Sequence, residues 1–458
     1  MKANIGIPKG TRDFNSKVMF RRNYIFKQVR SCFERFGYSP IETPSMENIE
    51  TLTGKYGDEG DRLIFKILKS GNFLKGVDNK ILLNPNDNLN IISKNISDKA
   101  LRYDLTIPFA RYVVQNQNEI HLPFKRYQIQ LVWRADRPQN GRFREFLQCD
   151  ADVIGSKSLL QEVDFIHLFH DVFNKLRVPN FKIRINHRKI LLGLSEILDL
   201  KDKFIDLTVI LDKIDKMGID KVVDEVLKIG LKSSLKPTLI DYLNITGSFN
   251  DRINYLKNIL AESKIGMEGI EDLSYVYDNI AKQKLDNNSL ELDISLARGL
   301  NYYTGVIYEV STNNNVKVGS IAAGGRYDNL TSLFGLNNVS GIGISFGLDR
   351  IYLLMDSLKL FPEIDKLNTK VLFINLNKNF DQFVINAVTE LRDNNINTDF
   401  YPDIVNLKKQ LKYANNIKVK YVVIVGENEF KKSKYLLKDM YDGSQSEHTL
   451  KSLIEKLK

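Results

Sequence analysis

Residues 125–134 read KRYQIQLVWR and residues 144–153 read REFLQCDADV, and these two stretches decide the fold of the larger part of the chain. Side chains alternate between the two faces of a β-strand. In each stretch one parity is mostly apolar, while the other carries Arg, Gln and Asp. The pattern predicts two antiparallel strands joined by a polar turn that Pro138, Asn140 and Gly141 shape.

The polar face of this predicted hairpin is either a solvated surface or the floor of a ligand site. Solvated faces favour Thr, Lys and Glu, whereas Arg, Gln and Asp recognise phosphates and small polar ligands through paired hydrogen bonds. The residue types therefore favour a ligand site. In the turn, Arg137, Gln139 and Arg142 suit a phosphate or the end of a nucleic acid, although a solvated turn would have a similar composition.

Three further segments combine short apolar strands with glycine turns. LDISLARGLNYYTGVIYEV (292–310) has Arg298 in a turn, and AAGGRYDNL (322–330) has two glycines that allow close backbone approach. GIGISFGLDRI (341–351) has the spacing G-x-G-x-x-x-G and lacks the acidic residue of a dinucleotide-binding fingerprint. It predicts instead a strand that leads into a helix, with Arg350 in the first turn.

Length and composition limit the class of protein. The chain has 458 residues, enough for two or three domains, with 43% apolar and 27% charged residues. Its two cysteines, Cys32 and Cys149, exclude a disulfide framework and a multi-cysteine metal site and indicate a reducing compartment. No apolar run approaches the roughly 20 residues that cross a bilayer, and residues 1–14 lack the apolar stretch of a signal peptide. We therefore expect a cytoplasmic protein with no membrane partner.

The net charge is +10, which is compatible with a nucleic-acid partner and equally with the Lys-rich composition of a biased genome. Residues 67–100 are rich in Asn and Lys and predict an inserted surface excursion. The expected organisation is a domain of residues 1–360 interrupted by a helical, charged segment at about 195–287, a linker at 361–369, and an α/β domain at 370–458.

Missing motifs narrow the chemistry. The sequence has neither G-x-x-x-x-G-K-[ST], the phosphate-binding loop, nor G-x-S-x-G, the nucleophile elbow of hydrolases. His167 and His170 are three residues apart on a predicted helix, but no third ligand for a metal ion accompanies them. We predict no metal site formed by protein ligands.

Taken together, these segments resemble the histidyl-tRNA synthetase family of class II aminoacyl-tRNA synthetases. PKGTRDF resembles the start of that family, and GYSPIETP resembles motif 1, the dimer-interface element. Residues 124–155 resemble motif 2 and residues 341–351 motif 3. ARGLNYYTG and AAGGRYDNL resemble the two signatures particular to the histidine enzyme, although the first commonly has Asp where this chain has Asn301.

The resemblance implies an α+β fold: an antiparallel sheet with flanking helices and a helical insertion, followed by a C-terminal α/β domain like the family's anticodon-binding domain. It implies a homodimer that attaches L-histidine to histidine tRNA through a histidyl-adenylate, using ATP with Mg²⁺ and releasing AMP and pyrophosphate. A catalytically inactive, synthetase-like regulatory subunit is the alternative. That alternative is disfavoured because the signature arginines and residues 370–458 are present.

The resemblance also assigns roles to individual residues. The positions that bind histidine match Asp104, Leu105, Thr106, Gln148, Asp152, Tyr302, Tyr303 and Tyr327. The positions that bind ATP match Arg134, Arg142, Arg298 and Arg350, of which Arg134 and Arg298 are catalytic. Fixed guanidinium groups suit that role because negative charge accumulates on the α-phosphate during attack. Arg137 and Gln139 match positions that contact the acceptor end of the tRNA, at its extra 5′ guanosine.

Overall fold

The computed structural model describes residues 5–75, 77–78, 81, 89–283, 285, 289–297, 302–312, 316, 318–362 and 369–458. The chain forms two compact units, Met1–Phe361 and Pro362–Lys458. Over the described ranges, no helix combines the length and the apolar character needed to cross a membrane.

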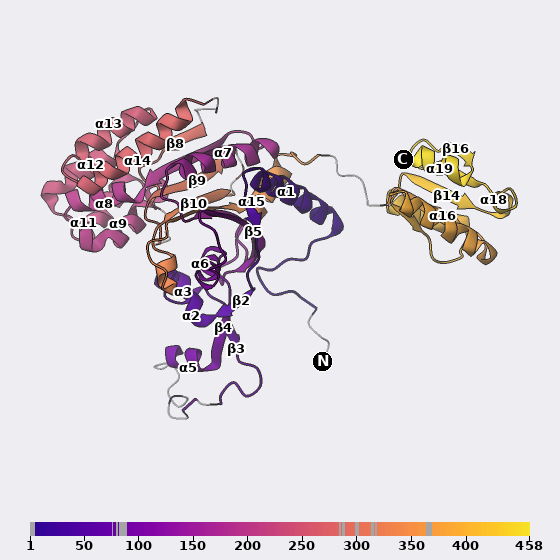
Figure 1. Ribbon diagram of the computed structural model, residues 1–458, viewed down its shortest axis with the longest axis horizontal. Coiled ribbons are helices and arrows are strands. Elements are labelled where there is room, and N and C mark those ends of the chain that lie inside the picture. Colours follow the sequence, from indigo (N-terminus) through magenta and orange to yellow (C-terminus); the bar gives the residue numbers. More distant parts are fainter. Residues whose placement is uncertain are drawn as a thin grey trace. The chain divides into compact units, whose positions relative to one another are not determined.

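The larger unit is built on a mixed sheet that has eight strands within its described residues (Figure 1). In spatial order they are β1 (Ser39–Pro40), β5 (Phe124–Trp133), β6 (Glu145–Ile154), β11 (Gly341–Gly347), β10 (Ala322–Tyr327), β9 (Val306–Thr312), β7 (Phe181–His187) and β8 (Leu290–Leu292). Neighbouring strands are antiparallel except in the parallel pairs β1–β5 and β7–β8. The predicted α+β class is confirmed.

Strands β5 and β6 form the predicted hairpin, and their register places the two polar parities on one face. Arg126 pairs with Asp152, and Gln128 pairs with Asp150. All four side chains are at most 2% exposed. The polar face is therefore not a solvated surface, and its charges lie inside the unit.

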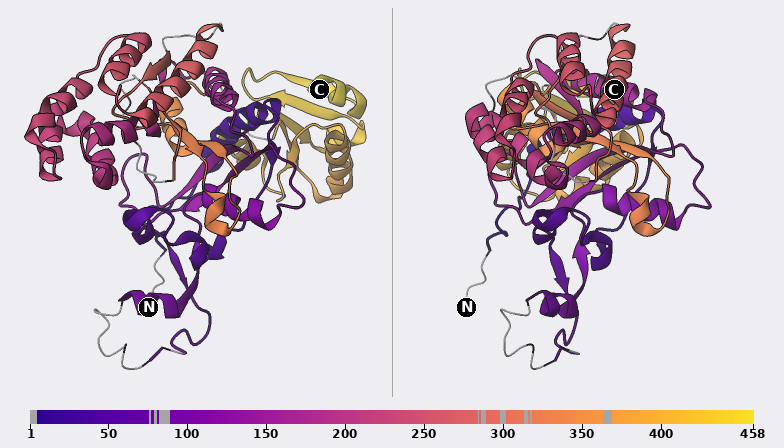
Figure 2. Two further views of the ribbon diagram at one scale, coloured as in Figure 1. Left: turned by 60° about the vertical axis from the view of Figure 1, so that its left-hand side comes forward. Right: turned by 90° about the vertical axis from the view of Figure 1, so that its left-hand side faces the viewer.

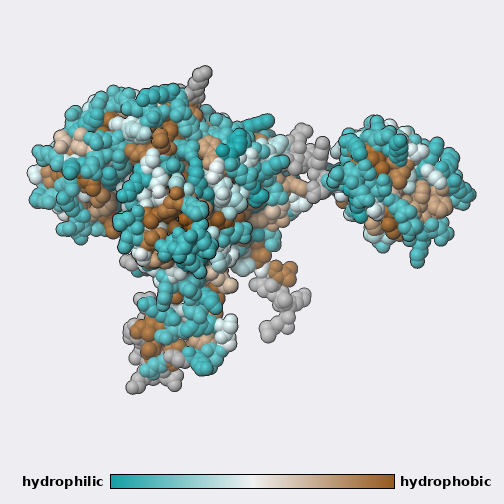
Figure 3. All heavy atoms as spheres, viewed as in Figure 1, coloured by the Kyte–Doolittle hydropathy of each residue, from teal (hydrophilic) through white to brown (hydrophobic). Residues whose placement is uncertain are grey.

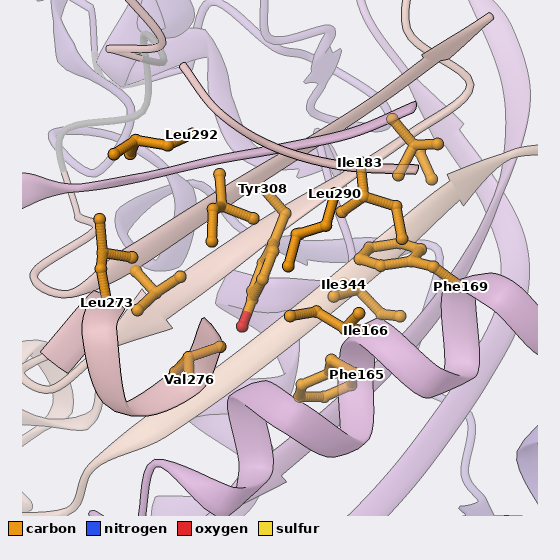
Figure 4. Packing of buried hydrophobic residues seen from close by; sticks show 14 of the residues in the cluster. Phe165, Ile166, Phe169, Ile183, Leu273, Val276, Leu290, Leu292, Tyr308 and Ile344 are labelled. Atoms are coloured by element: carbon orange, nitrogen blue, oxygen red, sulfur yellow. The ribbon is translucent and has the colours of Figure 1, made fainter. Parts of the chain in front are cut away.

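The other face of the sheet carries the hydrophobic core (Figure 4). Helices α1 (Ser16–Arg35), α7 (Leu160–Lys175) and α15 (Leu348–Ser357) pack on it. Phe165 and Phe169 of α7 lie beside Tyr308 and Ile344 of the sheet, all with at most 2% of their surface exposed (Figure 4). Burying each such large apolar side chain contributes about 1.5–3 kcal/mol to stability, so this face anchors the sheet.

A second sheet, with three strands among the described residues in the order β2–β4–β3, lies in a projection of the larger unit (Figures 1 and 2). Its elements are β2 (Met46–Asn48), β3 (Lys66–Leu68) and β4 (Ser97–Leu101), accompanied by α2 (Ile49–Leu52), α3 (Gly57–Arg62), α5 (Leu89–Ile96) and α6 (Thr106–Gln115). The segment 67–100 includes α5 and most of β4, and it exposes apolar side chains, among them Leu68, Leu74 and Leu89. Hydrophobic residues are visible on the surface of this projection in Figure 3.

Helices occupy most of the described residues between 188 and 281 (Figure 2). They are α8 (Arg188–Ile197), α9 (Phe204–Leu211), α10 (Ile214–Met217), α11 (Ile219–Lys228), α12 (Lys236–Leu243), α13 (Phe249–Ile259) and α14 (Lys264–Ala281). Their buried faces join the core of the main sheet through residues such as Leu194 and Leu273. The helical segment is thus packed onto the sheet.

The smaller unit has a sheet with five strands over its described residues, in the order β13–β12–β14–β15–β16. The strands are β12 (Val371–Asn375), β13 (Thr398–Phe400), β14 (Tyr421–Val425), β15 (Tyr435–Asp439) and β16 (Gln445–His448), and the helices are α16 (Asp381–Asp393), α17 (Leu407–Asn416), α18 (Glu427–Lys431) and α19 (Leu450–Leu457). β12 is parallel to both β13 and β14, and the other pairs are antiparallel. Separate apolar clusters cover its two faces.

Candidate active site

A cavity of about 500 Å³ lies at the polar face of the main sheet. Strands β6, β10 and β11 contribute to its lining, together with the residues around the start of α6 and the turn after β5. Ten of the residues singled out from the sequence line it: Asp104, Thr106, Arg134, Arg142, Gln148, Asp152, Tyr302, Tyr303, Tyr327 and Arg350. Segments up to about 250 residues apart in the chain therefore meet at one cavity.

Two side chains hold Asp152 in place, and Gly343 leaves room for it. The Tyr327 hydroxyl donates to its Oδ1 at 2.6 Å, and Arg126 Nη2 lies 2.8 Å from its Oδ2. Gly343 lies opposite Asp152 in the register of β11 and β6, and a Cβ at this position would lie 1.9 Å from Asp152 Oδ1. Burial raises the pKa of Asp152, while Arg126 and the Tyr327 hydroxyl oppose that effect.

Asp104 precedes α6 and is also buried. Its Oδ1 accepts from the Tyr56 hydroxyl at 2.8 Å and from the backbone N–H of Ile107 at 3.2 Å. Its Oδ2 has no hydrogen-bond partner among the described residues. Burial raises the pKa of Asp104, and the two hydrogen bonds oppose that effect. An acceptor that is buried, fixed and unpaired at a cavity suits a cationic group of a ligand.

Aromatic rings lie beside these carboxylates. The ring centres of Tyr302 and Tyr303 are 4.7 Å apart. The ring centres of Tyr302 and Tyr327 are 6.3 Å apart, and these two rings are perpendicular. Burial raises the pKa of Tyr302 and Tyr327 well above the usual value. Both phenols therefore keep their protons at neutral pH, and the hydroxyl of Tyr327 donates to Asp152.

Three arginines also line the cavity, and contacts with neighbouring groups hold their guanidinium groups in place. Arg134 donates from Nε to the Tyr103 carbonyl at 3.0 Å, and its guanidinium lies 4.3 Å from the centre of the Tyr103 ring. Arg142 Nη2 contacts Asp136 Oδ1 at 2.7 Å. Arg350 donates to the carbonyls of Gly141 and Ser320 at 3.1 and 2.8 Å. These contacts hold permanent positive charges where a phosphate could bind.

Some predicted residues lie elsewhere. Leu105 is fully buried and does not line the cavity, and its carbonyl accepts from Arg126 Nη2 at 3.4 Å. Arg137 and Gln139 are exposed in the turn, where the backbones of Gln139 and Arg142 pair. Arg298, predicted to be catalytic, lies outside the described residues, as does Asn301.

The cavity also includes residues that the sequence did not single out. Asp150 and Ser345 line it beside Gln148, and Asp349 lines it while paired with Arg12 at 2.8 Å and with Arg22. Asp150 lies on the polar parity of its strand, which was the available signal. Tyr56, the partner of Asp104, lies 48 residues earlier in the chain, and no sequence motif links the two.

Comparisons with known proteins agree with this geometry. The family model described as histidyl-tRNA synthetase matches residues 95–351, and the anticodon binding domain model matches residues 370–458. The histidine–tRNA ligase of Christiangramia forsetii is 54% identical over 440 residues, 96% of each chain. That of Flavobacterium johnsoniae is 49% identical over 461 residues, 97% of each chain.

A solved structure extends the agreement to three dimensions. The crystal structure of histidyl-tRNA synthetase from Nostoc sp. PCC 7120 matches with a TM-score of 0.80 at 28% identity. The match covers 100% of this chain and 99% of that one. The family predicted from the sequence motifs is confirmed by family model, relatives and structure alike. The chain belongs to the histidyl-tRNA synthetase family.

Proposed function

We propose that this chain attaches L-histidine to histidine tRNA in two steps that consume ATP. In the first step the carboxylate of histidine attacks the α-phosphorus of ATP, the bond to the leaving pyrophosphate breaks, and histidyl-adenylate forms. In the second step the terminal ribose hydroxyl of the tRNA attacks the carbonyl carbon, and AMP leaves. The observation that carries the proposal is one cavity that combines buried carboxylates and phenols with fixed guanidinium groups.

The carboxylates and phenols form the proposed histidine site. Asp104 has an unpaired buried oxygen for the α-ammonium group, and Thr106 and Gln148 line the same cavity. Asp152 and Tyr303 recognise the two imidazole nitrogens, and Tyr302 and Tyr327 line the ring pocket. Leu105 contributes through the backbone that orients Asp104. An amino acid without the imidazole nitrogens would leave these buried groups unpaired, which is how such sites discriminate.

The arginines form the proposed ATP site. Arg134 holds the α-phosphate and the reacting carboxylate, Arg142 and Arg350 bind the rest of the nucleotide, and Arg298 stabilises the α-phosphate during attack. These guanidinium groups remain charged at neutral pH, so they oppose the negative charge that develops in the transition state. Arg134 and Arg298 are therefore the proposed catalytic residues.

Mg²⁺ is proposed to enter the site bound to the phosphates of ATP. Asp349, an acidic side chain of the lining, is already paired with Arg12 and Arg22. The ion brought by the nucleotide would further neutralise the phosphates and make the pyrophosphate a better leaving group.

The tRNA is proposed to contact both units. The exposed side chains of Arg137 and Gln139 contact the acceptor end, and residues 370–458 bind the anticodon, as their family model implies. The proposed division is a catalytic domain at 1–360 with an insertion at about 195–287, a linker at 361–369, and the anticodon-binding domain. The active form is proposed to be a homodimer through the motif 1 segment. A cytoplasmic location is also proposed, in keeping with two buried, unpaired cysteines, Cys32 and Cys149.

Histidine-dependent exchange of pyrophosphate into ATP tests the proposal. We expect exchange with L-histidine, no comparable exchange with other amino acids, and charging of histidine tRNA. The regulatory alternative predicts no exchange, and the full-length relatives at 54% and 49% identity give it no support, because both are named as ligases. Absence of histidine-dependent exchange by a folded chain would contradict the proposed function.

A further inference from the structure

Gln148 has one end of its side-chain amide fixed and the other end unpaired. Its Nε2 donates to Ser345 Oγ at 3.0 Å. Its Oε1 is buried and has no hydrogen-bond partner in the described part of the chain. Because Gln148 lines the same cavity as Asp104, this oxygen can meet a ligand that Asp104 also contacts. An amide can turn over with almost no change in shape, so its partners decide which end stays available.

Ser345 by itself does not fix the orientation of the Gln148 amide. A hydroxyl group can donate one hydrogen bond and accept others, so Ser345 could receive a bond from Gln148 Nε2 or donate one to Gln148 Oε1. The choice depends on where the hydroxyl proton of Ser345 goes.

Asp150 supplies the missing constraint. It lies directly opposite Ser345 across β6 and β11, so the two side chains are neighbours on the polar face, and Ser345 lowers the pKa of Asp150. An ionised carboxylate can only accept, so in a hydrogen bond between the two the Ser345 hydroxyl is the donor. The oxygen of Ser345 is then left to accept from Gln148 Nε2. This order of donors and acceptors keeps Gln148 Oε1 unpaired at the cavity.

We propose that Asp150 and Ser345 form a hydrogen-bond relay that orients the amide of Gln148, so that its oxygen accepts from the α-ammonium group of histidine. The proposal rests on the proposed function and adds two positioning residues to it. With Gln148 reversed, Nε2 would face the ammonium group, and two donors would oppose each other. The relay thus supports a second acceptor besides Asp104 Oδ2 for the same group.

The electrostatic surroundings of Asp150 set the conditions for the relay. Burial raises the pKa of Asp150 to about 7, and its contacts with Arg126 and Ser345 oppose that effect. The charged or titratable groups around it come from several elements: Arg102, Asp104, Arg126, Cys149 and Asp152. Measurements should be made at pH 8, where the carboxylate form that accepts from Ser345 prevails.

Four variants and two ligands test the relay at pH 8. Ser345→Ala removes the hydroxyl between Asp150 and Gln148. Asp150→Leu removes the carboxylate and replaces it with an apolar side chain of similar size. Asp150→Asn keeps an oxygen that accepts from Ser345. Ser311→Ala, on β9 outside the cavity lining, is the matched control. The ligands are L-histidine and imidazolepropionate, which is histidine without its α-amino group, and both affinities are measured by calorimetry.

We expect Ser345→Ala and Asp150→Leu each to weaken histidine binding by about tenfold or more, the range of one hydrogen bond to a charged group. In exchange assays the KM for histidine rises while kcat and the KM for ATP stay within about twofold of the parent. Binding of imidazolepropionate is unchanged, because it lacks the ammonium group. Asp150→Asn, which keeps an accepting oxygen, loses less histidine affinity than Asp150→Leu, and Ser311→Ala behaves as the parent.

The double variant Ser345→Ala with Asp150→Leu separates a relay from two independent roles. In a relay, the second change costs nothing further, so the double variant binds histidine like the weaker single variant. Multiplied losses, equal losses with imidazolepropionate, or parent-like binding by Ser345→Ala would each overturn the relay. If Asp150→Leu does not fold, Ser345→Ala with the two ligands decides alone. An inactive parent contradicts the proposed function, whereas an active parent with unaffected variants contradicts only the relay.

Discussion

The main sheet and the sheet of the smaller unit bury different kinds of side chains. In the main sheet, one face of β5 and β6 buries Arg126, Gln128, Asp150 and Asp152. In the smaller unit, apolar side chains of β12 lie in separate clusters on the two faces of the sheet, Val371 and Phe373 on one and Leu372 and Ile374 on the other. One sheet therefore has a polar interior face, and the other is a scaffold with two apolar faces.

This difference indicates where each unit can bind a ligand. Burying polar groups without partners costs stability, and some buried atoms of the main sheet that belong to cavity-lining residues, such as Gln148 Oε1 and Asp150 Oδ1, have none among the described residues. A bound ligand can satisfy such groups at the cavity. In the smaller unit both sheet faces are filled, so recognition there must use side chains on its exterior.

Removing the charge of Arg298 is expected to have the largest effect on the main unit. Arg298→Ala should slow adenylate formation by about 10³-fold, because its charge acts when negative charge develops on the α-phosphate. Histidine affinity should change much less. Rapid-quench measurement of the first turnover tests this, and a rate within a few-fold of the parent would remove Arg298 from the catalytic step.

The pH dependence of stability distinguishes the polar face from an apolar one. The pKa of Asp150 is raised from 3.8 to about 7, so its protonated form stabilises the fold at low pH, and this contribution is lost as pH rises through about 4–7. Between pH 5 and pH 8 the parent should lose about 2–3 kcal/mol of unfolding free energy relative to Asp150→Asn. Denaturant titrations of both proteins at each pH measure this difference in unfolding free energy. If the unfolding free energies of the two proteins changed with pH in parallel, the pKa of Asp150 would not be raised.

Filling the space opposite Asp152 should break the histidine site alone. The added Cβ of Gly343→Ala would collide with Asp152 Oδ1, so the KM for histidine should rise about 100-fold while the KM for ATP stays unchanged. Gly347→Ala is the matched control on the same strand, because its nearest atom would be 3.6 Å away. Equal KM values for histidine in the two variants would show that a Cβ at residue 343 does not disturb Asp152 or histidine binding.

Deleting residues 370–458 tests whether the two sheets work separately. The smaller unit has its own apolar clusters, so the larger unit should fold without it and keep its pyrophosphate exchange. Charging of histidine tRNA should fall by about 30-fold in kcat/KM, since the anticodon contact is lost. Unchanged charging kinetics would contradict an anticodon-binding role for this unit.

The smallest expected effect concerns the exposed turn beside the polar face. Gln139→Ala should cost about 1–3 kcal/mol in charging only with tRNA that carries the extra 5′ guanosine, if Gln139 reads that base. Arg137→Ala should weaken all tRNAs alike and flatten the salt dependence, if Arg137 contacts a phosphate. Charging assays with and without the guanosine compare the two. Parent-like discrimination in both variants would leave the turn without a direct role.

Strand periodicity was sufficient to predict the polar face of β5 and β6. The period of two depends only on local backbone geometry, so it placed Arg126 with Gln128 on one strand and Asp150 with Asp152 on the other, and the register of β5 and β6 then joined the two pairs on one face. The motifs likewise identified the family, because residues such as Tyr303 and Tyr327 stand in short, specific signatures. Neither pattern could tell a solvated face from a buried one.

By itself the sequence determined which side chains share a face, which segments form strands and to which family the chain belongs. Only the tertiary structure decided that the polar face is buried, that Tyr56 meets Asp104 and that Ser345 meets Gln148. Those pairs are 48 and 197 residues apart, and the second depends on the register between β6 and β11. Register and burial arise from packing among distant segments, whereas periodicity is a property of a few consecutive residues.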